Sequence, residues 1–114
     1  MVTNGFYKIL YDGKTGSGIG MLVLLNGVAS GVDEAGVEYG GVYSEDLDTG
    51  AVQFQLSATV PANVALVIGV PAKAEPWSFS FGAVLPPGFV SGTRVPIRTP
   101  FGTVAVGFKL LRAL

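Results

Sequence analysis

The residues whose types and spacing bear most directly on function form an acidic segment between two strand-like stretches. Ser44-Glu45-Asp46-Leu47-Asp48-Thr49-Gly50 places three carboxylates within four residues. One interpretation is a solvated hairpin tip, because like charges this close repel one another. A second is a docking loop for a basic partner, where charge complementarity sets orientation and association rate. A third is a calcium site, although the segment lacks the regular ligand spacing and glycine of an EF-hand loop.

Other acidic and glycine-rich positions give weaker indications of chemistry. Asp33, Glu34 and Glu38 are of the right type for a carboxylate pair, but nothing in their spacing places an acid and a base across one cleft. Gly16-Ser17-Gly18-Ile19-Gly20 superficially suggests a phosphate-binding loop. It leads into a strand instead of a helix N-terminus, and no Gly-x-Ser-x-Gly nucleophile elbow is present. We therefore expect no catalytic residue, and we expect that the protein is not an enzyme.

Composition narrows the classes of function further. The chain has no cysteine and no histidine, so it has no disulfide, no thiolate nucleophile, no imidazole base and no ordinary zinc or copper site. We expect no metal and no cofactor. Seven basic and eight acidic residues give a net charge of −1, which argues against direct nucleic-acid binding through a basic face. The charges are segregated, since residues 15–72 carry six carboxylates and no lysine or arginine.

The elements that must position these residues are strands. Val52 to Val60 alternates apolar and polar residues throughout, and Trp77 to Phe81 repeats the pattern with aromatic residues. Asn26-Gly27 is the preferred pair for a tight hairpin turn. These patterns predict eight strands, near residues 5–11, 17–25, 28–33, 37–44, 51–60, 75–84, 90–98 and 103–111. Residues 62–70 fit a loop, a short helical turn or a strand extension, and Pro96 predicts a bulge or irregular end in the seventh strand.

Eight short antiparallel strands with tight turns predict an all-β chain and allow a sandwich or a closed barrel. We expect a small, lipocalin-like up-and-down antiparallel barrel that forms a single domain over residues 1–114. A barrel of eight strands is either filled by side chains or holds one small ligand. Five aromatic residues could fill this interior or line an apolar pocket for a lipid or other apolar small molecule: Phe54, Trp77, Phe79, Phe81 and Phe108.

One predicted strand is apolar on both faces. In Ile19 to Leu25 the odd positions form one apolar face, while Leu22 and Leu24 occupy the other. A strand of this kind must be covered on both faces. We expect Leu22 and Leu24 to form the interface of a homodimer; the alternative is that residues 62–70 or a terminus cover this strand within one chain.

The sequence predicts neither a signal peptide nor a membrane-spanning helix. The N-terminal residues have no basic start followed by an apolar stretch, and no apolar run approaches the roughly 20 residues of a spanning helix. The expectation is a cytoplasmic protein without a membrane role.

An ordered set of short motifs extends over about residues 4–56. It comprises Asn4-Gly5-Phe6-Tyr7, Gly16-Ser17-Gly18-Ile19-Gly20, Leu25-Asn26-Gly27, Gly31-Val32-Asp33 and Tyr39-Gly40-Gly41-Val42-Tyr43-Ser44-Glu45-Asp46-Leu47-Asp48. With these motifs the chain resembles the GrlR family, negative regulators of type III secretion gene expression. The resemblance implies a lipocalin-like eight-stranded barrel that dimerises and sequesters a transcriptional activator through an acidic surface loop.

The matching loop positions here are Glu45, Asp46, Leu47 and Asp48, where the family has Glu-Asp-Glu-Asp. Leu47 therefore stands in place of a glutamate and removes one negative charge. Asp33 is interpreted as a turn-capping carboxylate. The sequence thus predicts a non-enzymatic regulatory protein that binds a transcriptional activator; the alternative is a lipocalin-like carrier of a small apolar ligand.

Overall fold

The computed structural model describes residues 1–114, and all of its regular secondary structure is β-strand. The eight strands are β1 (Gly5–Asp12), β2 (Ser17–Leu25), β3 (Val28–Asp33), β4 (Glu38–Glu45), β5 (Val52–Val60), β6 (Trp77–Leu85), β7 (Val95–Thr99) and β8 (Gly102–Ala113). They form one antiparallel sheet in the order β6-β5-β4-β3-β2-β1-β8-β7. The chain contains no helix that could serve as a membrane-spanning segment.

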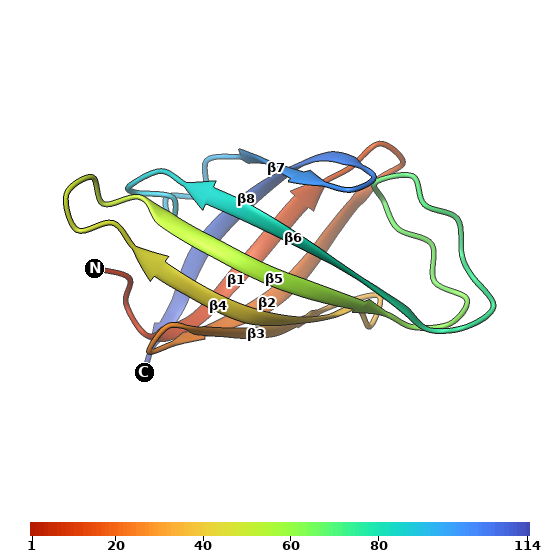
Figure 1. The fold of residues 1–114 in the computed structure, drawn as a ribbon, viewed down its shortest axis with the longest axis horizontal. Helices are drawn as coiled ribbons and strands as arrows, with labels where there is room; N and C mark the ends of the chain where they lie inside the picture. Colours follow the sequence, from red (N-terminus) through yellow and green to blue (C-terminus); the bar gives the residue numbers. More distant parts are fainter.

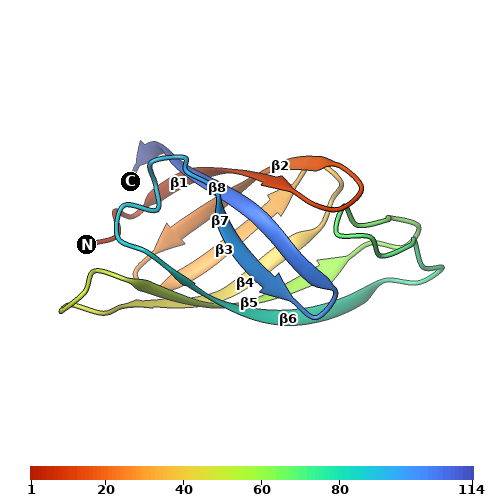
Figure 2. The ribbon, with the colours of Figure 1, turned by 90° about the horizontal axis from the view of Figure 1, so that it is seen from above.

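The sheet curls into a barrel, as the two views in Figures 1 and 2 show. The terminal strands of the sheet, β6 and β7, come together without a ladder of backbone hydrogen bonds between them. Aromatic side chains bridge this gap. Phe101, in the turn between β7 and β8, packs edge-on against Trp77 and Phe79 of β6, with ring centroids 5.4 Å and 5.2 Å away. These edge-to-face contacts hold the barrel nearly closed.

The predicted eight-stranded antiparallel barrel is confirmed, and most strand boundaries agree to within two residues. The Asn26-Gly27 turn has positive φ at both residues, 49° and 85°, as the tight hairpin requires. The seventh strand is shorter than predicted, because residues 90–94 form turns and bends before β7 begins. Pro96 lies within a continuous β7–β8 register at the end of the sheet, where an edge strand tolerates its missing N–H.

Large apolar side chains fill the end of the barrel nearer the termini. Tyr7, Leu24, Val52 and Leu85 lie at the ends of their strands on this side, and each is at most 2% exposed. Phe54 packs beside them, with its ring centroid 5.5 Å from that of Tyr43. Burying one such side chain contributes about 1.5–3 kcal/mol. These residues belong to a single cluster of 14 buried apolar residues inside the barrel.

The two faces of β2 are arranged in the opposite way to the prediction. Leu22 and Leu24 point into the barrel and are 2% and 0% exposed within the single chain. Their partners on β3 are Gly31 and Ala29, and Gly31 allows the two strands to approach closely, because a Cβ atom there would collide with the backbone carbonyl of Met21. The expected dimer contact through Leu22 and Leu24 is therefore wrong, because both are core residues.

Residues 61–76 connect β5 to β6 as a long loop at the end of the barrel away from the termini (Figure 1). This 61–76 loop has its own internal contacts, including the short bridge between Leu66 and Val70. It is also bonded to the β1–β2 turn, since the backbone N–H and the hydroxyl of Thr15 both donate to the carbonyl of Val67, at 2.8 Å and 3.1 Å. Of the three structures predicted as alternatives for residues 62–70, the loop is observed, and it crosses the end of the barrel.

Candidate ligand-binding cavity

A cavity of about 340 Å³ lies inside the barrel at the end covered by the 61–76 loop. Hydrophobic residues account for 17 of its 22 lining residues. Strands β2 and β8 line the cavity with Leu22, Val104, Val106 and Phe108. The 61–76 loop contributes Leu66 and Ile68 among others. Ligand sites in proteins are commonly concave, mostly apolar and of about 300–1,000 Å³. The cavity lies at the lower end of that range.

A cluster of three polar side chains lies in the cavity wall. Asp33, at the end of β3, is 7% exposed and is the one buried charged residue of the chain. The hydroxyls of Tyr11 and Tyr39 both donate to its Oδ2 atom, at 2.7 Å and 2.8 Å. β1, β3 and β4 thus bring one carboxylate and two phenols to the same place, and we call these residues the Tyr–Asp–Tyr cluster.

The other carboxylate oxygen of Asp33 holds the β3–β4 turn. Its Oδ1 atom accepts hydrogen bonds from the backbone N–H groups of Ala35 and Val37, at 2.9 Å and 3.1 Å. A carboxylate accepts about four hydrogen bonds, so Asp33 is fully partnered. Burying an unpaired carboxylate would be costly, and these four bonds offset that cost. The predicted turn-capping role of Asp33 is present, together with two tyrosine contacts that were not predicted.

The environment of the cluster keeps both tyrosines in their neutral form. Burial raises the pKa of Tyr11 far above its ordinary value near 10, and the hydrogen bond to Asp33 acts in the same direction. Burial and the negative charge of Asp33 raise the pKa of Tyr39 as well. Each phenol therefore keeps its hydrogen and directs it to the carboxylate.

Gly18 makes room for the Tyr11 ring. The two residues are paired across β1 and β2, and a Cβ atom at position 18 would collide with the ring and hydroxyl of Tyr11. This close approach explains one glycine of the Gly16-Ser17-Gly18-Ile19-Gly20 run as a packing requirement at the cavity wall.

The predicted aromatic pocket residues divide into two groups. Phe79, Phe81 and Phe108 line the cavity, as expected for an apolar pocket. Phe54 lies in the core cluster at 2% exposure, and Trp77 lies outside the cavity against Phe101 and beneath the ammonium of Lys73. The structure therefore places Phe54 and Trp77 in packing roles.

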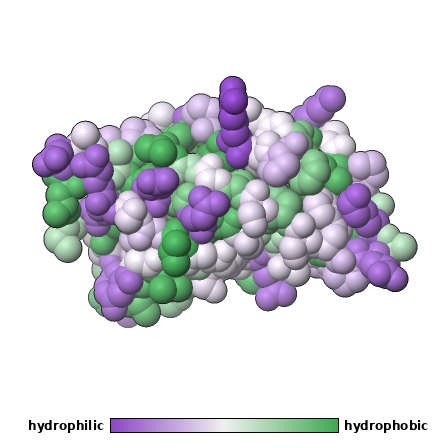
Figure 3. Space-filling view, viewed as in Figure 1, coloured by the Kyte–Doolittle hydropathy of each residue, from purple (hydrophilic) through white to green (hydrophobic).

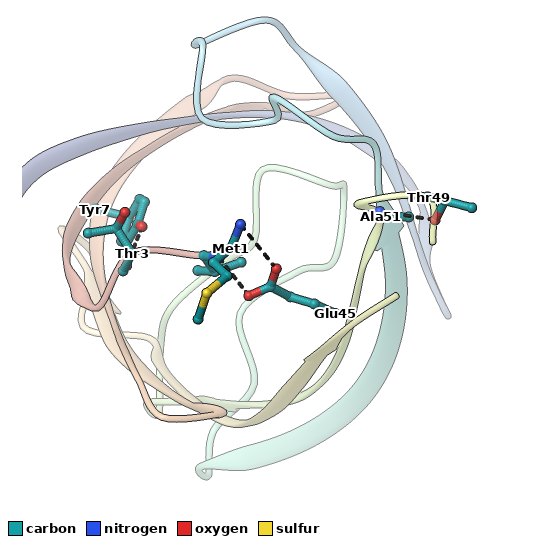
Figure 4. Close-up of polar contacts among 7 residues, drawn as sticks. Met1, Thr3, Tyr7, Glu45, Thr49 and Ala51 are labelled. Atoms are coloured by element: carbon teal, nitrogen blue, oxygen red, sulfur yellow. Dashed lines mark hydrogen bonds and ion pairs between the residues drawn. The ribbon is translucent and has the colours of Figure 1, made fainter. Parts of the chain in front are cut away.

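The acidic segment lies at the opposite end of the barrel from the cavity (Figure 1). Figure 4 shows Glu45 pointing inward across this end, toward Met1. Its Oε1 accepts from the backbone N–H of Val2 at 2.6 Å, and its Oε2 lies 3.6 Å from the amino group of Met1. Tyr7 anchors the same N-terminal stretch by donating its hydroxyl to the carbonyl of Thr3. Glu45 thus holds the N-terminal residues in place.

The next carboxylate of the segment has a structural task as well. Asp46 Oδ1 accepts from the backbone N–H groups of Asp48 and Thr49, at 2.9 Å and 3.3 Å, which stabilises the turn. Leu47 is 88% exposed and the Asp48 side chain is exposed. Of the four predicted partner-binding residues, Leu47 and Asp48 are exposed and make no side-chain hydrogen bond, whereas Asp46 is exposed but uses its Oδ1 atom in the turn.

The remaining carboxylate candidates are separated by the sheet. Glu34 is exposed and lines the rim of the cavity next to Asp33, whereas Glu38 points outward from β4. The structure brings together Asp33 and Glu34 but not Glu38. No group of three or more metal-ligating side chains converges anywhere in the chain.

An apolar patch covers part of the outside of the barrel. It consists of side chains from β2, β3 and β4 that are 40–57% exposed: Ile19, Met21, Leu25, Val28, Val32 and Val42. Cross-strand pairs such as Met21 with Val32, and Val28 with Val42, make this outer apolar face continuous. Apart from Gly82 and Val84, the outer faces of β5 and β6 carry Gln, Ser and Thr instead, and this side of the molecule shows pale and purple atoms with green patches between them in Figure 3.

Sequence reasoning missed Tyr11, Tyr39 and the 61–76 loop as parts of the site. The alternation of inward and outward residues could have placed two members of the cluster. Tyr11 shares the inward face of β1 with Tyr7 and Ile9, and Asp33 shares the inward face of β3 with Ala29. All three polar residues stand where neighbouring strands reach the same end of the barrel. A buried carboxylate next to two inward tyrosines is the pattern that could have indicated the cluster.

Fold and cavity together define an antiparallel β-barrel with an internal, mostly apolar cavity and a Tyr–Asp–Tyr cluster in its wall. In comparisons with protein-family models, curated proteins and solved structures, no match to this chain was found.

Proposed function

We propose that this protein is a non-enzymatic binding protein whose barrel holds one small apolar molecule. The observation that carries the proposal is the 340 Å³ cavity, which is lined mainly by hydrophobic side chains and covered by the 61–76 loop. An apolar space of this size next to a well-filled core is a natural ligand site. A binding role without catalysis is supported by Asp33, whose four hydrogen bonds leave it no free position for taking a proton from a substrate.

Filling the cavity tests this function. Val104 lines the cavity and is 8% exposed, so Val104→Phe places a ring in the space a ligand would occupy. We expect the variant to fold and to bind decanol about tenfold more weakly or worse, because excluding two methylenes costs about 1.6 kcal/mol. Displacement of an environment-sensitive apolar fluorophore by decanol measures the affinity.

The matched control is Val84→Phe, which makes the same change on the outer face of β6 at a side chain that is 67% exposed. This variant should bind decanol like the unmodified chain. Equal affinities in the Val104→Phe and Val84→Phe variants would place the ligand elsewhere, and no decanol binding in any of the proteins would contradict the proposed function.

A second candidate function is the sequestration of a transcriptional activator by protein contact, as in negative regulation of type III secretion. It is supported by the resemblance to the GrlR family and by the exposure of Leu47 and Asp48 at the tip of the acidic segment. A contact there would join an apolar side chain to a carboxylate, and its rate of formation would fall with ionic strength. Such a regulator would act in the cytoplasm, which the lack of cysteine fits.

The test changes only Leu47 and Asp48, because the side chains of Glu45 and Asp46 make hydrogen bonds that hold the local structure. We expect Leu47→Ala with Asp48→Lys to abolish capture of a basic activator at low salt, while Glu75→Lys, at another exposed carboxylate, leaves capture unchanged. Quantitative affinity capture with a purified candidate activator gives the measurement. Undiminished capture by the double variant would refute docking at this tip.

We propose that a second copy of the chain covers the outer apolar face. An exposed apolar patch that is continuous over three strands is unusual on a monomer and typical of an interaction surface. The expected homodimer is therefore kept, with its contact moved from Leu22 and Leu24 to the opposite face of β2.

A further inference from the structure

The side-chain hydroxyls of the cavity lining offer a ligand hydrogen-bond acceptors but no donors. Four lining residues carry a hydroxyl, and each hydroxyl has a single hydrogen to donate. Tyr11 and Tyr39 donate theirs to Asp33. Ser17 donates to Asp12 Oδ1 at 2.7 Å, and Thr99 donates to the carbonyl of Gly102 at 2.8 Å. Every hydroxyl hydrogen of the lining is therefore used within the protein. The oxygen of Thr99 already accepts from the backbone N–H of Phe101 at 3.1 Å, and the oxygens of Tyr11, Tyr39 and Ser17 are left as acceptors.

The charged residues of the cavity lining are all acidic. Asp33 and Glu34 are the two charged residues of the lining, and no lysine or arginine is among them. The Tyr–Asp–Tyr cluster holds its hydrogens toward Asp33, so a ligand that reaches it meets phenolic oxygens backed by a carboxylate. A carboxylate ligand would find like charge and no side-chain donor there.

We propose that the ligand of this cavity is a lipophilic amine, an apolar body that carries a protonated amino group. An ammonium is a pure donor with three hydrogens, which complements a lining whose side-chain hydroxyls can only accept. The Tyr–Asp–Tyr cluster and Glu34 provide acceptors and negative charge, and the rings of Phe79 and Phe81 lie in the same wall. This inference rests on the proposed ligand-binding function and names its substrate class.

Three ten-carbon compounds that differ only at the head group test the inference. Decylamine is protonated at neutral pH, as a lysine side chain is, decanol is neutral, and decanoate is an anion. We expect decylamine to bind about tenfold more tightly than decanoate or better, with decanol between them, because opposite charges at close range attract strongly in a partly buried site. Isothermal titration below the aggregation concentrations of the compounds gives affinity and a stoichiometry of one.

Variants assign the preference to the cavity. Glu34→Gln removes one charge at the rim without touching the Tyr–Asp–Tyr cluster, and it should reduce the decylamine-to-decanoate affinity ratio by about threefold or more. Glu38→Gln removes the same charge from the outer face of β4 and should leave the ratio unchanged. Asp33→Asn should reduce the ratio further; if that variant does not fold, the Glu34 and Glu38 pair still decides the question.

The outcomes separate this inference from the function on which it rests. Binding of decanol and decanoate with an affinity equal to or higher than that of decylamine would overturn the inference and leave a carrier of apolar ligands. An equal effect of Glu34→Gln and Glu38→Gln would overturn it too, since the preference would then come from overall charge. Binding of none of the three compounds would overturn both the inference and the proposed function.

Discussion

Asp33 combines two tasks at the scale of a single residue. Its Oδ1 atom fixes the β3–β4 turn and its Oδ2 atom fixes two tyrosines, so the same carboxylate shapes a loop and sets the polarity of the cavity. The turn task was predictable, because aspartate commonly accepts from backbone N–H groups two residues on. The second task depends on Tyr11 and Tyr39, which come from two other strands and reach Asp33 only in the closed sheet.

Titration of the tyrosines tests the cluster. The folded state holds the pKa of Tyr11 and Tyr39 above the value near 10 of an unfolded chain. Stability is therefore complete below about pH 10 and falls as the pH rises above it, because the unfolded state releases protons that the folded state keeps. The fall should approach about 1.4 kcal/mol per pH unit for each such tyrosine.

Urea unfolding at a series of pH values above about 9 measures this slope. Tyr39→Phe should reduce the dependence of the unfolding free energy on pH by the contribution of about one proton. The variant should also be less stable at neutral pH by about 1–2 kcal/mol, because the hydrogen bond to Asp33 is lost. A slope that is the same in the variant and the unmodified chain would show that Tyr39 ionises as freely in the fold as outside it.

Among the secondary-structure elements, the positions of the strands were easier to predict than their orientation in the barrel. Alternation and turn residues were sufficient to place all eight strands, as Val52 to Val60 shows most clearly. They were not sufficient to orient β2, because both of its faces are apolar and the period alone does not say which is inward. The contrast between Gly31 and Ala29 on one face of β3 and Val28 and Val32 on the other carries that information, since small residues face the leucines.

The cavity itself could not be predicted, because its volume depends on how the 61–76 loop crosses the barrel. Ile68 packs against the core from this loop and also lines the cavity. We expect Ile68→Asp to weaken decanol binding about tenfold or more, because the new carboxylate would be desolvated by an apolar ligand. Fluorophore displacement provides the measurement.

Asn63→Asp is the control for this change. Asn63 is exposed on the same loop and has a positive φ of 64°, a conformation that aspartate also tolerates. It should bind decanol normally. If Ile68→Asp binds as well as Asn63→Asp does, the 61–76 loop does not cover the bound ligand.

The whole molecule presents three separate surfaces: an internal cavity at one end, a small acidic tip at the other, and an outer apolar face on one flank. If that flank joins two copies, both ends of each barrel stay accessible. Met21→Asp with Val32→Asp places two like charges on paired strands in the middle of this face. We expect this variant to sediment as a monomer at concentrations where the unmodified chain is a dimer.

Ser57→Asp with Ser80→Asp provides the matched control, because these two side chains are also paired across neighbouring strands, on the polar outer face of β5 and β6. This control should remain dimeric. Sedimentation velocity that shows a monomer for the unmodified chain, or a dimer for the Met21 and Val32 variant, would reject the outer apolar face as the subunit contact.

The most direct test of the account asks where an apolar molecule binds. Methyl groups at the cavity, on Leu22, Val104 and Val106, can be compared by NMR with those of Leu24, Val52 and Leu85 in the filled core and those on the outer apolar face. On titration with decanol, the account predicts saturable shifts and ligand-to-protein nuclear Overhauser effects at the cavity methyls. Shifts confined to Met21, Val28 and Val32, or no shifts at any methyl, would contradict it.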